Sequence, residues 1–114
     1  MSILYGLALL TAASTAMVDA EVSRVNYSNC LTDFTVTHLD QKTARAAFRK
    51  AAETACAEER NAMIAAIKKD ELEFGSSEAE ATSYANEEAA SVLSSFTEGY
   101  ASYLSSNTRP VKQQ

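Results

Sequence analysis

The chain has 114 residues, with ten basic and fifteen acidic side chains, a length that allows one domain. A Rossmann enzyme, a TIM barrel and a two-domain enzyme are therefore excluded. The chain holds 21 alanines against three glycines and one proline, which favours helices over an all-β fold. Only 16 of the 94 residues after Ala20 are Leu, Ile, Val or Phe, so intrinsic disorder is an alternative.

Residues 1–20 have the pattern of a signal peptide. An apolar run from Ile3 to Ala13 precedes small and polar residues, and Val18 and Ala20 occupy positions −3 and −1 of a cleavage site before Glu21. The segment contains no Lys or Arg, which departs from the usual positive start. An uncleaved anchor is the alternative, but an apolar run of about eleven residues is short of the roughly twenty that span a bilayer.

Cleavage would leave a soluble domain, residues 21–106, in the periplasm or outside the cell. Because such compartments are oxidising, we predict a disulfide between the two cysteines, Cys30 and Cys56. Free-thiol redox chemistry is the alternative. It needs a Cys-x-x-Cys motif or a nearby activating group, and neither is visible in the sequence.

Hydrophobic periodicity predicts a first helix over residues 23–39, with Ser23 as a possible N-cap. Its apolar stripe has the i, i+3, i+4, i+7 spacing and consists of Tyr27, Cys30, Leu31 and Phe34. A second helix is predicted over residues 44–74. Its apolar face is mostly alanine, and Gly75 provides a left-handed stop.

The third predicted helix covers residues 77–105 and begins with the capping box Ser77-Glu78-Ala79-Glu80. Residues 107–114 contain the only proline and are expected to form a flexible tail. The sequence therefore predicts an all-α fold, a three-helix antiparallel bundle with one disulfide.

The two cysteines also predict the position of the first turn. In an antiparallel hairpin, each cysteine must lie at a similar distance from the turn for their Cα atoms to approach within about 7 Å. The midpoint of positions 30 and 56 is 43, so we place the turn near residues 40–43, with Thr43 or Asp40 as the next N-cap.

Charge is segregated along the chain. Residues 41–69 carry seven basic and three acidic side chains, whereas residues 70–108 carry eight acidic and no basic ones. One interpretation is that the second and third helices are complementary partners in the bundle. The other is that a basic cluster binds an anionic envelope component, such as lipid headgroups or cell-wall phosphates. The members of this cluster are Lys42, Arg45, Arg49 and Lys50. The acidic total and the predicted export argue against nucleic acid.

The predicted third helix carries an aromatic series that includes Tyr100 and Tyr103. These side chains either fill space that the small alanines leave in the core, or form an exposed ridge that binds a partner protein or a glycan.

Motifs for catalysis, cofactors and metals are scarce. His38 is the only histidine, no Gly-x-Ser-x-Gly elbow or glycine-rich phosphate loop is present, and one histidine with two paired cysteines leaves no zinc site. We therefore expect no enzyme activity, no cofactor and no metal.

The arrangement Tyr27-x-x-Cys30-Leu31, Phe48-x-x-Ala51 and Ala55-Cys56 resembles small exported two-cysteine helical proteins of Gram-negative bacteria, over residues 24–67. This resemblance implies a periplasmic location and no particular activity. The sequence thus predicts a non-catalytic interaction module for an envelope component or a partner protein. The alternative is a small periplasmic enzyme or an inhibitor of one, which needs a cleft or a protruding loop.

Overall fold

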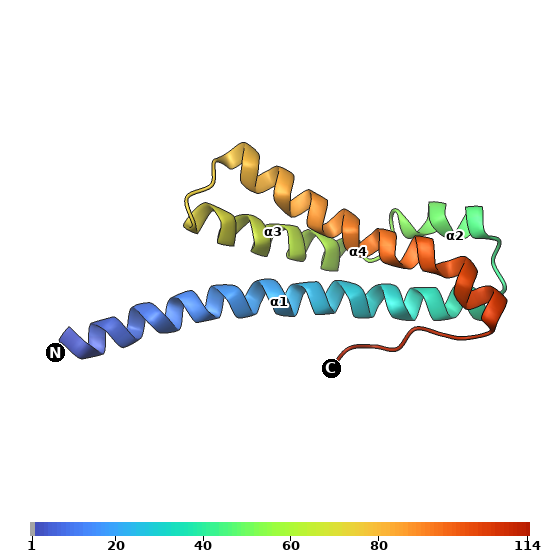
Figure 1. Ribbon diagram of the computed structural model, residues 1–114, viewed down its shortest axis with the longest axis horizontal. Helices are drawn as coiled ribbons and strands as arrows, with labels where there is room; N and C mark the ends of the chain where they lie inside the picture. Colours follow the sequence, from blue (N-terminus) through green and yellow to red (C-terminus); the bar gives the residue numbers. More distant parts are fainter. Residues whose placement is uncertain (1) are drawn as a thin grey trace.

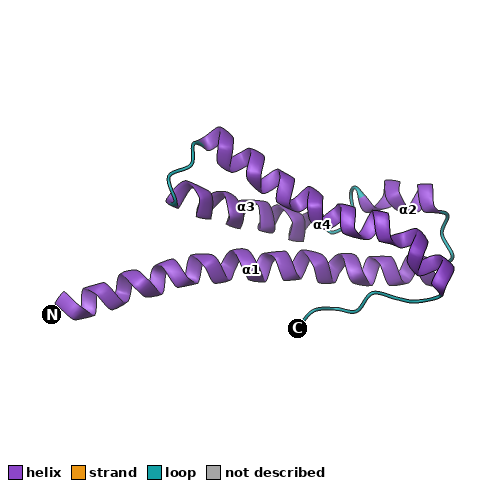
Figure 2. Cartoon of the chain, in the orientation of Figure 1, coloured by secondary structure: helices purple, strands orange, loops and turns teal. Residues whose placement is uncertain are grey.

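The computed structural model describes the backbone of residues 2–114 and the side chains of residues 19–114. It contains four helices, α1 (Ser2–Asp40), α2 (Arg45–Ala52), α3 (Ala57–Glu73) and α4 (Glu78–Ser106). Residues 2–114 include no strand (Figure 2). The all-α prediction is therefore confirmed.

The helices form an elongated assembly of 61 × 30 × 20 Å. From the end of α1, α2 and α3 lead back along it, and α4 then runs again in the direction of α1 (Figure 1). α4 packs against all three other helices.

Two apolar clusters hold the helices together. The first lies between α1, α3 and α4, and its buried members are Ala20, Tyr27, Leu31, Met63, Ile67, Ala85 and Ala89. The second lies between α1, α2 and α4, and consists of Leu39, Phe48, Ala52 and Tyr100. The alanines of α4 allow close helix packing, while the few large side chains fill the clusters. This division explains how a chain with few large apolar residues forms a core.

The start of α4 confirms the predicted capping box. The Ser77 hydroxyl accepts a hydrogen bond from the Glu80 backbone N–H at 3.1 Å, and the Glu80 carboxylate accepts one from the Ser77 backbone N–H at 3.2 Å. These bonds lower the pKa of the Glu80 carboxyl. Just before this cap, Gly75 has φ +98°, which confirms the left-handed stop after the preceding helix.

Replacing Ser77 with alanine should lower the free energy of unfolding by about 1 kcal/mol, because the Glu80 N–H at the helix start loses its acceptor. Urea denaturation of the variant and the wild type measures this change. Ser83→Ala is the control, since Ser83 is exposed and lies inside α4. Equal losses in both variants would contradict the role of the cap.

The single helix predicted over residues 44–74 is wrong. The chain leaves helical geometry after Ala52, and Cys56 adopts a left-handed backbone with φ 58° before α3 begins. The reason is tertiary. Phe48 and Ala52 pack into the second cluster, whereas Cys56 must approach Cys30 of α1. No glycine or proline marks the break, so periodicity alone continues through it.

The turn between α1 and α2 lies at residues 41–44, close to its predicted position. The predicted N-cap is wrong, because Ala44 precedes α2 and no side chain caps it. The Thr43 hydroxyl instead lies 2.8 Å from Nδ1 of His38. Asp40 is the last residue of α1.

The first helix is longer than predicted. It continues through Ser23 and past the expected cleavage point between Ala20 and Glu21, so Ser23 is not its N-cap. The expected signal peptide falls almost entirely on residues whose side chains lie outside the described part, and its cleavage stays a prediction. Within the part of the chain that the structure describes, no helix has both the length and the apolar character needed to cross a membrane.

The segment expected to be a flexible tail, residues 107–114, leaves the end of α4 and runs back beside α1 (Figure 1). Asn107 has φ 55°, and its backbone N–H bonds to the carbonyl of Tyr103. This left-handed residue turns the chain and directs the tail along α1.

Candidate interaction surfaces

The predicted basic cluster lies at one end of the molecule, on the α1–α2 turn and on α2 (Figure 1). We call its four exposed side chains the basic surface: Lys42, Arg45, Arg49 and Lys50. Arg45 and Arg49 are four residues apart and so lie on one side of α2. Phe48 and Ala52 are buried and anchor α2 in the second cluster.

None of the four basic side chains forms an ion pair with any residue that the structure describes. Two acidic residues of α4 pair elsewhere, Glu88 with Arg24 at 3.2 Å and Glu78 with Lys68. The charges of α2 are thus not neutralised by α4. Complementary pairing between the two oppositely charged stretches occurs only near the α3–α4 connection, through Lys68.

The effect of charge on helix stability explains the positions of only some of these basic residues. Arg49 and Lys50 lie in the last turn of α2, where positive charge is favourable. Arg45 is the first residue of α2, where positive charge opposes the helix dipole. Lys42 has φ 53°, a left-handed conformation that a lysine adopts at an energetic cost.

Tyr100 belongs to the core. Its side chain is 0% exposed and stacks on Phe48 with ring centroids 3.9 Å apart. Its hydroxyl donates to the carbonyl oxygens of Thr43, at 2.7 Å, and of His38, at 3.1 Å. Burial raises the pKa of this hydroxyl. The residue therefore holds the α1–α2 turn onto α4 and is not part of an exposed ridge in this fold.

Tyr103 is half-buried and packs against the same cluster. It also lines a cleft beside the tail. The exposed tyrosine of α4 is Tyr84, near the other end of that helix, where the Glu88 charge raises the pKa of the Tyr84 hydroxyl. The three tyrosines of α4 thus lie in the core, beside a cleft and on the surface.

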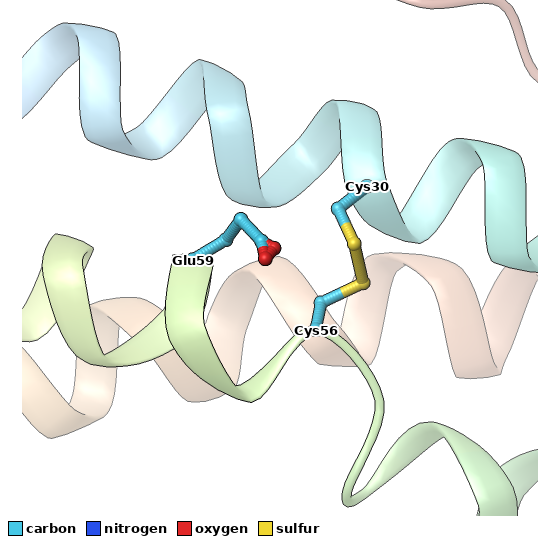
Figure 3. A group of neighbouring side chains, drawn as sticks. All are labelled: Cys30, Cys56 and Glu59. Carbon is cyan, nitrogen blue, oxygen red and sulfur yellow. A yellow bond between two sulfur atoms is a disulfide. The ribbon is translucent and has the colours of Figure 1, made fainter.

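The predicted disulfide is present. It joins Cys30 of α1 to Cys56 at the start of α3, with Cα atoms 6.0 Å apart. The Glu59 carboxylate lies beside it (Figure 3), and one oxygen and both sulfurs lie within 4.8 Å of one another. These three residues are the one group of potential metal ligands among the described residues. In the disulfide, both sulfurs are bonded to each other, so neither is the thiolate that a metal requires.

The residues around His38 have structural roles. The centroid of its ring lies 4.4 Å from the centroid of the Phe34 ring, and its Nδ1 is within hydrogen-bond distance of the Thr43 hydroxyl. Asp40, the nearest acidic residue in sequence, forms an ion pair with Arg109 of the tail. Histidine and carboxylate are therefore not joined in a catalytic arrangement.

Sequence reasoning missed the residues of α1 that hold the tail, which are Asn29, Asp33 and Asp40. Their spacing of four and seven places them on one face of α1. The two basic residues of the tail, Arg109 and Lys112, carry the complementary charge. This pattern was available in the sequence, but nothing in it showed that the tail returns to α1.

Comparison of the chain with protein-family models, with curated proteins and with solved structures finds no match.

Proposed function

We propose that this protein is a small, non-catalytic interaction module, exported to the periplasm or outside the cell. It binds an anionic component of the envelope through the basic surface. The observation that carries the proposal is the set of four exposed basic side chains without ion pairs in the described residues, on a protein that is acidic overall.

Electrostatics makes such a surface selective for anions. Each basic residue near an anionic membrane contributes about 1 kcal/mol, and the attraction falls off within a Debye length of about 8 Å at physiological ionic strength. An anionic membrane or polymer repels the acidic side chains of the α3–α4 hairpin. This repulsion favours an orientation in which the basic surface faces the anion. The oxidised cysteines are typical of proteins in an oxidising compartment outside the cytoplasm.

The test compares two double variants of the oxidised full chain, which lose the same charge. Arg45→Gln/Arg49→Gln removes half of the basic surface, and Lys68→Gln/Lys69→Gln removes two positive charges from α3. Binding to phosphatidylglycerol vesicles and to inorganic polyphosphate is measured by co-sedimentation and fluorescence anisotropy at several salt concentrations. The vesicles report lipid headgroups, and polyphosphate reports a non-lipid phosphate polymer.

The arginine variant should bind the preferred anion about tenfold to thirtyfold more weakly than the wild type, because two contributions of about 1 kcal/mol are lost. The lysine variant should stay close to the wild type. Binding that ignores salt, equal losses in both variants, or no binding to either anion would contradict the proposal.

A further inference from the structure

The tail and α1 form a polar ladder in antiparallel register. Arg109 pairs with Asp40, the Lys112 ammonium lies 2.8 Å from the Asp33 carboxylate, and Gln113 meets Asn29. From Asp40 to Asp33, α1 rises by about 10.5 Å. From Arg109 to Lys112, an extended chain rises by about 10 Å. Seven residues of helix and three residues of extended chain thus span nearly the same length. The spacing of the two carboxylates on α1 therefore matches the spacing of the two basic residues in the tail.

The Asn29 side chain binds the backbone of the tail. Its Nδ2 donates to the Gln113 carbonyl at 2.9 Å, and its Oδ1 accepts from the Gln113 N–H at 2.8 Å. A single side-chain amide thereby satisfies both backbone groups of one residue, as a neighbouring strand does. Main-chain hydrogen bonding of this kind supplies affinity in proteins that bind extended peptides. The Gln113 side chain adds one further contact, since its Nε2 donates to the Ser28 hydroxyl at 3.3 Å.

The tail is held mostly by exposed polar groups. The side chains of Asp33, Asp40, Arg109 and Lys112 are 54–62% exposed, and exposed ion pairs contribute at most about 1 kcal/mol each. Val111 is 84% exposed, whereas Pro110 is half-buried above the cleft that Tyr103 lines. Little apolar area is buried, so a competing segment can displace the tail.

A second cleft lies between the end of the described tail and α1. It has a volume of about 470 Å³ and is lined by residues 21, 22, 25 and 26 of α1 and by Gln113 and Gln114. Val22 and Val25 line this cleft, and Val22 is 50% exposed. An apolar side chain that follows the two glutamines would therefore gain contacts that residues 108–114 do not make.

We propose that this face of α1, from Val22 to Asp40, is a binding site for an extended peptide of a partner protein. Residues 108–114 are its intramolecular ligand. The partner segment carries two basic side chains three residues apart. The residue that follows the second basic residue is bound through its backbone. An apolar side chain comes one or two residues later. This site is separate from the basic surface, so either proposal can fail without the other.

The test uses the oxidised full chain and a fluorescent peptide with the sequence of residues 108–114 followed by leucine. Arg109→Ser/Lys112→Ser releases the tail and leaves the groove unchanged. A tethered ligand acts at an effective concentration on the order of 1 mM. For a peptide with a Kd of roughly 0.1 mM, this competition weakens binding about tenfold, so the released variant should bind the peptide about tenfold more tightly than the wild type in fluorescence anisotropy.

Two further comparisons test the ladder and the cleft. In the released variant, Asn29→Ala should weaken peptide binding at least about tenfold, because two backbone hydrogen bonds are lost. Asn61→Ala, an exposed position on α3, should have no effect. A peptide that ends in serine instead of leucine should bind about fivefold more weakly, because it buries less apolar surface.

Circular dichroism of each variant verifies that the helices are intact. If Asn29→Ala unfolds the chain, Asp33→Asn/Asp40→Asn replaces it, since these exposed carboxylates carry the same ladder. The proposal is overturned if the released variant binds the peptide no better than the wild type. It is also overturned if the loss of the ladder leaves binding unchanged, and the apolar part fails if both peptides bind equally.

Discussion

Tyr100→Ala should lower the free energy of unfolding by about 3–5 kcal/mol, the range for loss of a large buried aromatic side chain. Tyr100 is fully buried, stacks on Phe48 and donates to two carbonyl oxygens in and near the α1–α2 turn. A loss of this size is a large share of the 5–15 kcal/mol typical of a domain. Urea denaturation followed by circular dichroism measures it.

Two control variants separate the causes. Tyr100→Phe keeps the ring stacking and removes only the hydroxyl, so it should lose about 1–2 kcal/mol. Tyr84→Ala removes a tyrosine that is 44% exposed and should change stability far less. If Tyr100→Ala and Tyr84→Ala have equal small effects, the core role is wrong and an exposed aromatic ridge becomes the better interpretation.

Reduction of the Cys30–Cys56 disulfide should lower stability by about 3 kcal/mol, because it restores the freedom of a 26-residue loop in the unfolded chain. For a domain of this size, the melting temperature should fall by roughly 10–20 °C. The disulfide also holds α3 against α1 beside the first cluster, where many contacts are made by small alanines. Thermal melts with and without dithiothreitol measure the shift.

The variant Cys30→Ala/Cys56→Ala provides the matched control. It should melt close to the reduced wild type, and dithiothreitol should not change its melting temperature. A wild-type melt that dithiothreitol leaves unchanged would show that the disulfide adds nothing to stability. Sensitivity of the double variant to dithiothreitol would show that the reagent acts in some other way.

The two binding proposals rest on different helices and different chemistry. The basic surface on α2 binds anions through exposed cations, whereas the tail groove on α1 binds basic side chains through carboxylates and a backbone through Asn29. Charge removal at Arg45 and Arg49 should not change peptide binding. Asn29→Ala should not change binding to anionic vesicles. Measuring both ligands with both variants therefore tests each proposal independently.

Short sequence signals predicted several local features, although the predicted N-caps at Ser23 and at Thr43 or Asp40 were wrong. The capping box at Ser77, the left-handed Gly75 and the turn near residues 41–44 all follow from short-range chemistry or from the spacing of the two cysteines. The disulfide was predictable because only two cysteines exist and both lie on apolar stripes.

The break between α2 and α3 and the path of the tail were decided only in three dimensions. Alanine-rich periodicity continues through residues 53–56, and the chain bends there because two clusters and a disulfide require different positions of the same segment. The tail has no apolar periodicity, and its place depends on charges about seventy residues away in sequence, such as the pair of Asp40 and Arg109. Composition and spacing therefore determined that this chain is helical and stapled. Packing between distant segments determined which surfaces are available for binding.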